Sequence, residues 1–161
     1  MRLSYIIIIS IIIVLILVLI PILIFVLPLL KEKKIENINH LRFSYSTGYH
    51  MNAYVIYEID LVDGKYIAKI KPTDIEEEKT KEIEISKEKV KELEKELNKY
   101  HVSRWDGFKK SDKNVLDGDS FSISIRMNND NNISASGYMM WPNNYREVKN
   151  YLDTTLGSLY E

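Results

Sequence analysis

The feature that most constrains this chain is an uncharged apolar stretch from Leu3 to Leu30, in which only Ser4, Tyr5 and Ser10 are polar. As a helix rising about 1.5 Å per residue it would cover roughly 42 Å, enough to cross a hydrocarbon core of about 30 Å with tilt. A cleavable secretory signal has a shorter apolar core and a small-residue cleavage site, and a core helix has a polar face. The sequence therefore predicts a single transmembrane anchor over residues 1–30, with the lipid bilayer as its partner.

The charges beside the anchor bear on its orientation. Arg2 precedes the apolar stretch, whereas Lys31, Lys33 and Lys34 lie after it, and positive charge alone favours a cytoplasmic domain. A chain whose only membrane segment is its first thirty residues resembles a signal anchor that exports the domain on its carboxyl side. We therefore expect a single-pass protein of the cell membrane with an extracytoplasmic domain, and a cytoplasmic domain is the alternative.

Composition excludes several functions. The chain carries 22 Lys and Arg against 23 Asp and Glu, so it has no broad positive field for nucleic acid. It has no cysteine, which removes disulfides, thiolate metal sites and cysteine nucleophiles. Residues 31–39 are charged and polar and are expected to form a juxtamembrane linker. Residues 40–161 have the length of one soluble domain.

Alternating apolar residues predict two strands in residues 53–70, joined by a tight turn at Asp63-Gly64. If Val62 pairs with Lys65, both strands present their apolar residues to one face. Shorter alternating segments predict strands at residues 41–45 and 81–85. Ser86 is a plausible N-cap for the amphipathic helix expected after it.

The second half of the domain is expected to add a hairpin and a helix. Residues 121–127 and 133–138 alternate, and a loop at Asn129-Asp130-Asn131 would place Ile125 opposite Ala135. An apolar stripe after Pro142 predicts the last helix, with an asparagine as its cap. The fold class is therefore α+β: an antiparallel sheet of about six strands with two helices on one face, in the order four strands, helix, two strands, helix.

No motif for catalysis, metal binding or a cofactor is found. His40, His50 and His101 are widely separated and lack a paired-ligand spacing, so no metal site is expected. There is no G-x-S-x-G, G-x-G-x-x-G or lysine-containing phosphate loop, so no catalytic residue is assigned and no cofactor is expected. Two carboxylates brought together only by folding would escape this search.

Aromatic residues are the better candidates for function. Tyr54 and Ile56 are expected on the sheet face opposite the core, where an apolar patch could bind a partner or be covered by a loop. Trp105 and Trp141 each lie in a loop beside a predicted helix, and either contact a ligand or cover the core. With Tyr138, on the second hairpin, these residues are the candidate binding set.

Short motifs in the domain resemble a recurrent type of small bacterial protein. Trp105-Asp106-Gly107 is followed by Asp117-Gly118, an alternating strand, Gly137 and Pro142 before a closing helix. The proteins it resembles are uncharacterised and commonly exported or membrane-anchored. This chain departs from them at Phe121, where tryptophan is more usual, and in lacking a lipid-modified cysteine. The resemblance implies an extracytoplasmic location and no activity.

The sequence therefore predicts a membrane-anchored protein that displays a small binding or sensing domain for a protein or small molecule. Two alternatives stay open. One is a hydrolase whose carboxylates or His101 converge only in the folded chain, and the other is a structural subunit of a membrane complex.

Overall fold

The computed structural model describes residues 16, 17, 20, 32–48, 54–71, 80–128 and 131–159. The chain divides into two compact units, Met1–Lys33 and Lys34–Glu161, and the sheet with its two helices belongs to the second. The predicted anchor over residues 1–30 lies outside the described residues except for Ile16, Leu17 and Ile20. Within the described part of the chain, no helix is long and apolar enough to span a bilayer.

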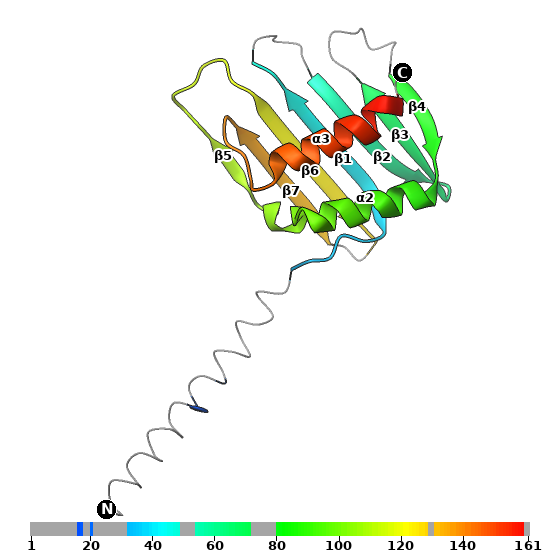
Figure 1. Cartoon of the computed structure of the whole chain (residues 1–161), viewed down its shortest axis with the longest axis horizontal. Helices are drawn as coiled ribbons and strands as arrows, with labels where there is room; N and C mark the ends of the chain where they lie inside the picture. The colour runs from blue at the N-terminus through cyan, green and yellow to red at the C-terminus, as the bar shows by residue number, and fades with distance from the viewer. Residues whose placement is uncertain are drawn as a thin grey trace, which may run out of the picture. The chain divides into compact units, whose positions relative to one another are not determined.

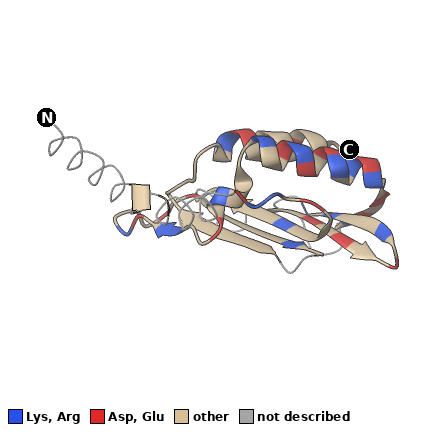
Figure 2. Ribbon diagram, turned by 90° about the horizontal axis from the view of Figure 1, so that it is seen from below, with Lys and Arg blue, Asp and Glu red and all other residues tan. Residues whose placement is uncertain are grey.

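The second unit is an α+β domain with a mixed sheet and two α-helices (Figure 1). Its elements are β1 (Ile38–Ser46), β2 (Tyr54–Val62), β3 (Lys65–Lys71), β4 (Lys81–Ile85), α2 (Lys87–Lys99), η2 (Val102–Trp105), β5 (Lys109–Ser111), β6 (Ser120–Met127), β7 (Asn132–Tyr138), α3 (Tyr145–Thr155) and η3 (Gly157–Leu159). Both α-helices cover the same face of the sheet, as Figure 2 shows from the side. The α+β class and the helices on one face are confirmed.

The sheet has seven strands in the order β4-β3-β2-β1-β6-β7-β5. The expectation of about six antiparallel strands was wrong in one respect, because β5 adds a seventh strand that pairs in parallel with β7. Its three residues, Lys109–Ser111, are exposed and polar, so they carry no hydrophobic alternation from which a strand could be predicted. The loop before β5 brings the strand beside β7, because the Gly107 N–H donates to the Ser134 carbonyl of β7 at 2.9 Å.

The register of the first predicted hairpin is confirmed. Val62 pairs with Lys65 across Asp63 and Gly64, which both have positive φ, and Ile59 pairs with Ala68. Ile59, Ala68 and Ile70 are fully buried beneath the helices. Turn geometry and apolar alternation therefore select the same register, as a tight hairpin requires.

The register of the second hairpin was predicted wrongly by two residues. Ile125 pairs with Ile133 rather than with Ala135, although both apolar sets still face the core. The Asn128 N–H donates to the Asn37 carbonyl at 3.1 Å, so it does not take part in the hydrogen bonds of the hairpin. The Met127 N–H instead pairs with the Asn131 carbonyl, and the turn begins one residue earlier than expected.

The two helices pack an apolar stripe each onto the sheet. Ser86 caps α2 as predicted, because its hydroxyl accepts the Lys89 N–H at 3.2 Å. Asn144 precedes α3 with a positive φ and makes no side-chain cap; its amide donates instead to the Tyr100 carbonyl after α2. The buried residues of the two stripes are Val90, Leu93, Leu97, Val148, Leu152 and Leu156.

The folded unit begins before β1. Ile35 and Ile38 are fully buried, so the segment 31–39, expected to be a linker, contains two residues of the core. The Asn98 side chain of α2 accepts the Ile35 N–H at 2.9 Å and donates to the Ile35 carbonyl at 2.7 Å. Glu94 accepts the Ile38 N–H at 2.9 Å. We call this set of hydrogen bonds the Asn98 clasp.

A β-bulge between Ile38 and His40 explains how an isolated isoleucine reaches the core. The irregularity turns Ile38 toward the helices while His40, two residues later, lies on the opposite face with Arg42 and Ser44. The bulge residue Asn39 has a buried side-chain oxygen that accepts no hydrogen bond from the described residues. We call the face of the sheet opposite α2 and α3 the open face.

Candidate functional site

A cluster of aromatic rings joins the two predicted tryptophans at the start of α3. Trp141 stacks on Tyr145, with ring centroids 4.5 Å apart and planes 19° from parallel. Tyr145 contacts Phe121 of β6 at 4.7 Å, and Phe121 meets Trp105 edge-on at 6.1 Å. The structure therefore brings Trp105 and Trp141 together, although 36 positions (141 minus 105) separate them in the chain.

The two tryptophans differ in accessibility. Trp105 is 2% exposed, and its indole N–H donates to the Asn143 carbonyl at 3.0 Å. It therefore covers the core and holds the Trp141 loop. Trp141 is 38% exposed, and the preceding Met139 and Met140 are exposed to a similar extent. Of the predicted pair, only Trp141 presents a ring that a ligand can reach.

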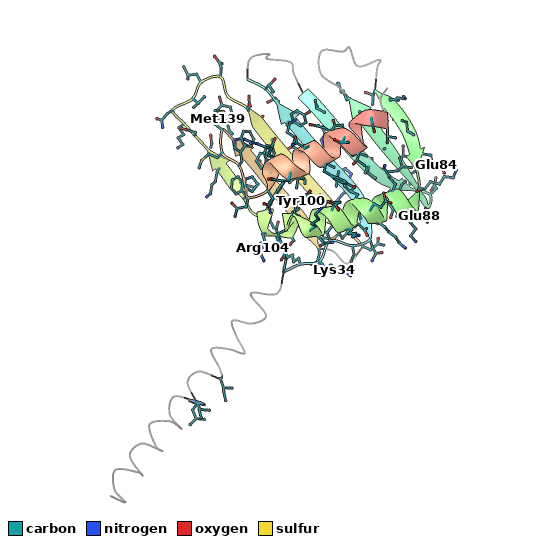
Figure 3. All side chains as sticks on the ribbon, in the orientation of Figure 1. Lys34, Glu84, Glu88, Tyr100, Arg104 and Met139 are labelled. Atoms are coloured by element: carbon teal, nitrogen blue, oxygen red, sulfur yellow. The ribbon has the colours of Figure 1, made fainter. Side chains whose placement is uncertain are left out.

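Two hollows flank the Trp141 loop. The larger, of about 480 Å³, lies toward β1 and α3, and the smaller, of about 310 Å³, lies toward the end of α2. Trp141, Pro142 and Asn144 line both. The larger is also lined by Tyr45, Ser46, Thr47, Asp119, Tyr145, Arg146, Glu147 and Lys149. The smaller is also lined by Tyr100, His101, Arg104, Trp105, Phe108, Lys110 and Asn143. Tyr100 and Arg104, near the end of α2, and Met139 are labelled in Figure 3.

A hydrogen-bonded network fixes the inner wall of the larger hollow. One carboxylate oxygen of Asp153 accepts the hydroxyls of Tyr45 at 2.9 Å and Tyr57 at 2.8 Å. The other accepts the Lys149 ammonium at 2.7 Å, and that ammonium lies 4.0 Å from the centroid of the Tyr45 ring. The network joins α3 to β1 and β2, so the lining residues Tyr45 and Lys149 are held in one arrangement.

The same network changes the tyrosine acidities. Burial raises the pKa of the Tyr57 hydroxyl well above its usual range, and the hydrogen bond to Asp153 adds to the increase. Burial and the Asp153 charge likewise raise the pKa of Tyr45. Burial is also the main cause of the raised pKa of Tyr145. Tyrosine is ordinarily protonated at neutral pH, and the raised pKa values extend this to higher pH, so the Tyr45 and Tyr57 hydroxyls act as hydrogen-bond donors to Asp153.

These shifts predict a pH dependence of stability. The folded state favours protonated tyrosine, so this contribution is complete below the unfolded pKa of about 10 and is lost as pH rises through the higher folded value. We expect the free energy of unfolding to fall as the pH rises above about 10, and to fall less in Tyr57→Phe. Urea unfolding followed by circular dichroism at a series of pH values measures how steeply the free energy of unfolding falls with pH in the native chain and in the variant. Equal slopes in the two proteins would contradict the assignment.

The other candidate residues lie elsewhere. Ile56 is half-buried on the open face of β2, three strands from β7 in the sheet order. The side chain of Tyr54 lies outside the described residues. The Tyr138 hydroxyl donates to the Leu116 carbonyl at 2.8 Å and accepts the Gly118 N–H at 2.8 Å, so it fastens the loop before β6. Tyr138 is therefore occupied in holding the fold.

Sequence reasoning missed Tyr145 as a member of the site, and it did not single out the exposed Met139 and Met140 that precede Trp141 in the chain. A signal was present, because Met139-Met140-Trp141-Pro142 is an apolar run immediately after a strand, where a polar turn is the rule. Gly137 also contributes. A Cβ there would collide with the Met140 carbonyl and approach the Phe121 ring to 2.5 Å, so only glycine lets this loop fold back onto Phe121.

One group of side chains among the described residues could hold a metal ion: His40, Glu58 and Asp60, on the open face. It lies on the other side of the sheet from the aromatic cluster. No protein-family model matches the chain, and no curated protein matches its sequence. The fold and the site thus define an α+β domain with an accessible tryptophan between two hollows, and function has to be argued from that geometry.

Proposed function

We propose that this protein is a membrane-anchored binding module whose ligand contacts Trp141. The uncharged stretch from Leu3 to Leu30 supports a single membrane span, because it exceeds the length that a bilayer requires. The resemblance to small exported or membrane-anchored bacterial proteins supports an extracytoplasmic domain. The domain then presents its binding surface outside the cytoplasm.

The observation that carries the proposal is the position of Trp141, an exposed indole stacked on Tyr145 between two hollows. Ligand pockets of about 300 to 1,000 Å³ lined by aromatic side chains and a few polar groups are typical of small-molecule sites. Tryptophan, tyrosine and arginine are also the residues that dominate binding energy at protein interfaces. In the stacked pair of Trp141 and Tyr145, the Tyr145 ring also packs against Phe121, so little side-chain freedom is lost on binding.

The lining of the larger hollow suggests the ligand's chemistry. Trp141 and Tyr145 offer flat apolar surfaces, while Arg146 and Lys149 contribute positive charge and Asp119 and Glu147 negative charge. A ligand that presents a ring to Trp141 and polar substituents of both kinds to the rim matches this surface. An aromatic or saturated ring of a small molecule fits, as does an aromatic side chain of a peptide.

Binding is better supported than hydrolysis. His101 lines the smaller hollow, whose other described lining residues are aromatic rings, asparagines, Pro142 and the cations Arg104 and Lys110. In the network behind the larger hollow, both oxygens of Asp153 accept short hydrogen bonds from Tyr45, Tyr57 and Lys149. A carboxylate engaged in this way holds the wall of the hollow in one arrangement.

Trp141→Ala is expected to weaken ligand binding by at least about tenfold, since a central aromatic contact is commonly worth about 2 kcal/mol or more. The assay is ligand-observed NMR with a panel of ring-containing small molecules and short aromatic peptides, using the full chain in mild detergent. Compounds that bind the native chain are then titrated against the variant.

Val62→Ala is the matched control, because Val62 is also an exposed apolar residue, at 51%, but lies at the β2–β3 turn. It should leave affinity unchanged. If every compound that binds does so equally well to Trp141→Ala, the proposed surface is wrong. Binding only to other proteins of the same membrane would instead favour the structural-subunit alternative.

The orientation predicts the activity of reporter fusions at Glu161. A reporter enzyme that works only outside the cytoplasm should be active there, and one that works only in the cytoplasm should be inactive, because Leu3–Leu30 exports the domain on its carboxyl side. The reverse pattern would overturn the extracytoplasmic assignment and support the orientation that Lys31, Lys33 and Lys34 favour.

A further inference from the structure

We propose that His40, Glu58 and Asp60 form a binding site for one divalent transition-metal ion of the zinc type on the open face of the sheet. The three residues come from two adjacent strands. The β1–β2 register places His40 directly opposite Asp60 and Arg42 directly opposite Glu58. Their neighbours Leu41 and Ile59 are fully buried, so the register directs the three side chains away from the core.

The potential ligand atoms converge on one point. His40 Nδ1 lies 2.7 Å from Asp60 Oδ1 and 4.0 Å from Glu58 Oε1, and each residue offers one ligand atom within 4.8 Å of those of the other two. Ligands of a tetrahedral zinc ion at about 2.0 to 2.1 Å from the metal are roughly 3.3 Å apart. To bind zinc, His40 Nδ1 and Asp60 Oδ1 would have to move apart from 2.7 Å, and Glu58 Oε1 would have to move closer to His40 than 4.0 Å.

A hydrogen bond between His40 and Asp60 does not account for the position of the Glu58 carboxylate. Asp60 accepts the imidazole Nδ1–H, whereas Glu58 Oε1 lies 4.0 Å from the same nitrogen, beyond hydrogen-bond distance. Arg42 binds the other oxygen, Glu58 Oε2, at 3.1 Å. Arg42 thereby orients Glu58 so that Oε1 faces His40, which is how residues outside the ligand set commonly position a metal-binding carboxylate.

The surroundings suit a half-enclosed metal site. The side chains of His40, Glu58 and Asp60 are 14%, 22% and 24% exposed, so one side of the cluster is left for water or another ligand. One imidazole and two carboxylates match zinc or manganese better than magnesium, which prefers oxygen ligands alone.

Other charged groups on the open face affect how strongly the three residues are expected to bind a metal ion. Lys69 of β3 is aligned with Glu58 and lies 3.6 Å from Glu82, and Arg126 of β6 is aligned with His40. With Arg42 these cations oppose the two carboxylates. The site is therefore expected to prefer an ion that bonds strongly to imidazole over one held by charge alone.

The test is zinc binding by the full chain in mild detergent, first stripped with EDTA and then dialysed against zinc sulfate. We expect one zinc ion per chain. His40→Ala and Asp60→Asn should each weaken binding by about tenfold or more. His101→Ala, which removes an exposed histidine far from the cluster along the chain, should leave it unchanged.

Absence of zinc from the native chain, or equal zinc binding by His40→Ala, would overturn the proposal. Thermal unfolding without zinc checks that each variant folds. If His40→Ala does not fold, the nearly isosteric Asp60→Asn and Glu58→Gln decide the question. Magnesium chloride serves as the second probe, and binding of magnesium as tight as that of zinc would contradict a site built on His40.

Discussion

Phe121→Ala is expected to lower the free energy of unfolding by about 3 to 5 kcal/mol, the largest loss at any single position of the aromatic cluster. Phe121 is 3% exposed, and its ring contacts those of Trp105, Phe108, Trp141 and Tyr145. Truncation leaves a cavity beneath the stacked pair, so both hollows should lose their shape. Urea unfolding of the full chain in detergent measures the loss, and tryptophan fluorescence should shift because both indoles contact Phe121.

Phe108→Ala is the control for this prediction. It makes the same chemical change, but Phe108 is only partly buried and lies at the edge of the cluster, with Phe121 as its ring contact among those described. Its cost should be less than half that of Phe121→Ala. An equal loss in the free energy of unfolding for the two variants would show that Phe121 is no more important to the aromatic cluster than Phe108.

Asn98→Ala is expected to lower the free energy of unfolding by about 2 to 3 kcal/mol. The substitution removes the amide that both accepts from and donates to the backbone of Ile35, and it leaves a partly buried N–H and carbonyl without partners. The first buried residue of the domain should then detach from α2. Hydrogen exchange should show faster exchange at Ile35 and Ile38.

Asn150→Ala makes the same change on the exposed side of α3 and should alter stability by less than about 0.5 kcal/mol. Because alanine has a higher helix propensity than asparagine, propensity cannot cause a loss in either variant, and a comparable loss in the two would mean that the hydrogen bonds to Ile35 are not its cause. Protection of Ile35 that is unchanged in Asn98→Ala would show that the Asn98 clasp contributes little.

Local patterns in the sequence were enough to predict the parts of the fold that depend on neighbouring residues. The Asp63-Gly64 turn and the alternation on both sides of it define the β2–β3 register, because only one pairing satisfies both. Ser86 lies directly before an amphipathic stripe, so the start of α2 could also be predicted. In each case the residues that decide the structure lie within a few positions of one another.

Features decided by distant residues could not be predicted. The Asn128 N–H donates to the carbonyl of Asn37, far away in the sequence, so it is not available to the second hairpin, whose register differs by two residues from the predicted one. The polar strand β5 has no pattern of its own. The sequence predicted only part of the candidate site. Trp141 was named as a candidate, but its stacking on Tyr145 depends on the fold and could not be predicted. His40, Glu58 and Asp60 escaped a search based on spacing along one element, because they meet across two strands.

The place of β1 in the sheet limits how the domain can be separated from the rest of the chain. β1 is the first strand in the sequence but lies fourth in the order, with β2, β3 and β4 on one side and β6, β7 and β5 on the other. Removal of β1 would divide the sheet into two groups of three strands, each with a newly exposed edge. A protease that releases an intact domain must therefore cut before Ile35, in the few residues between the apolar stretch and the Asn98 clasp.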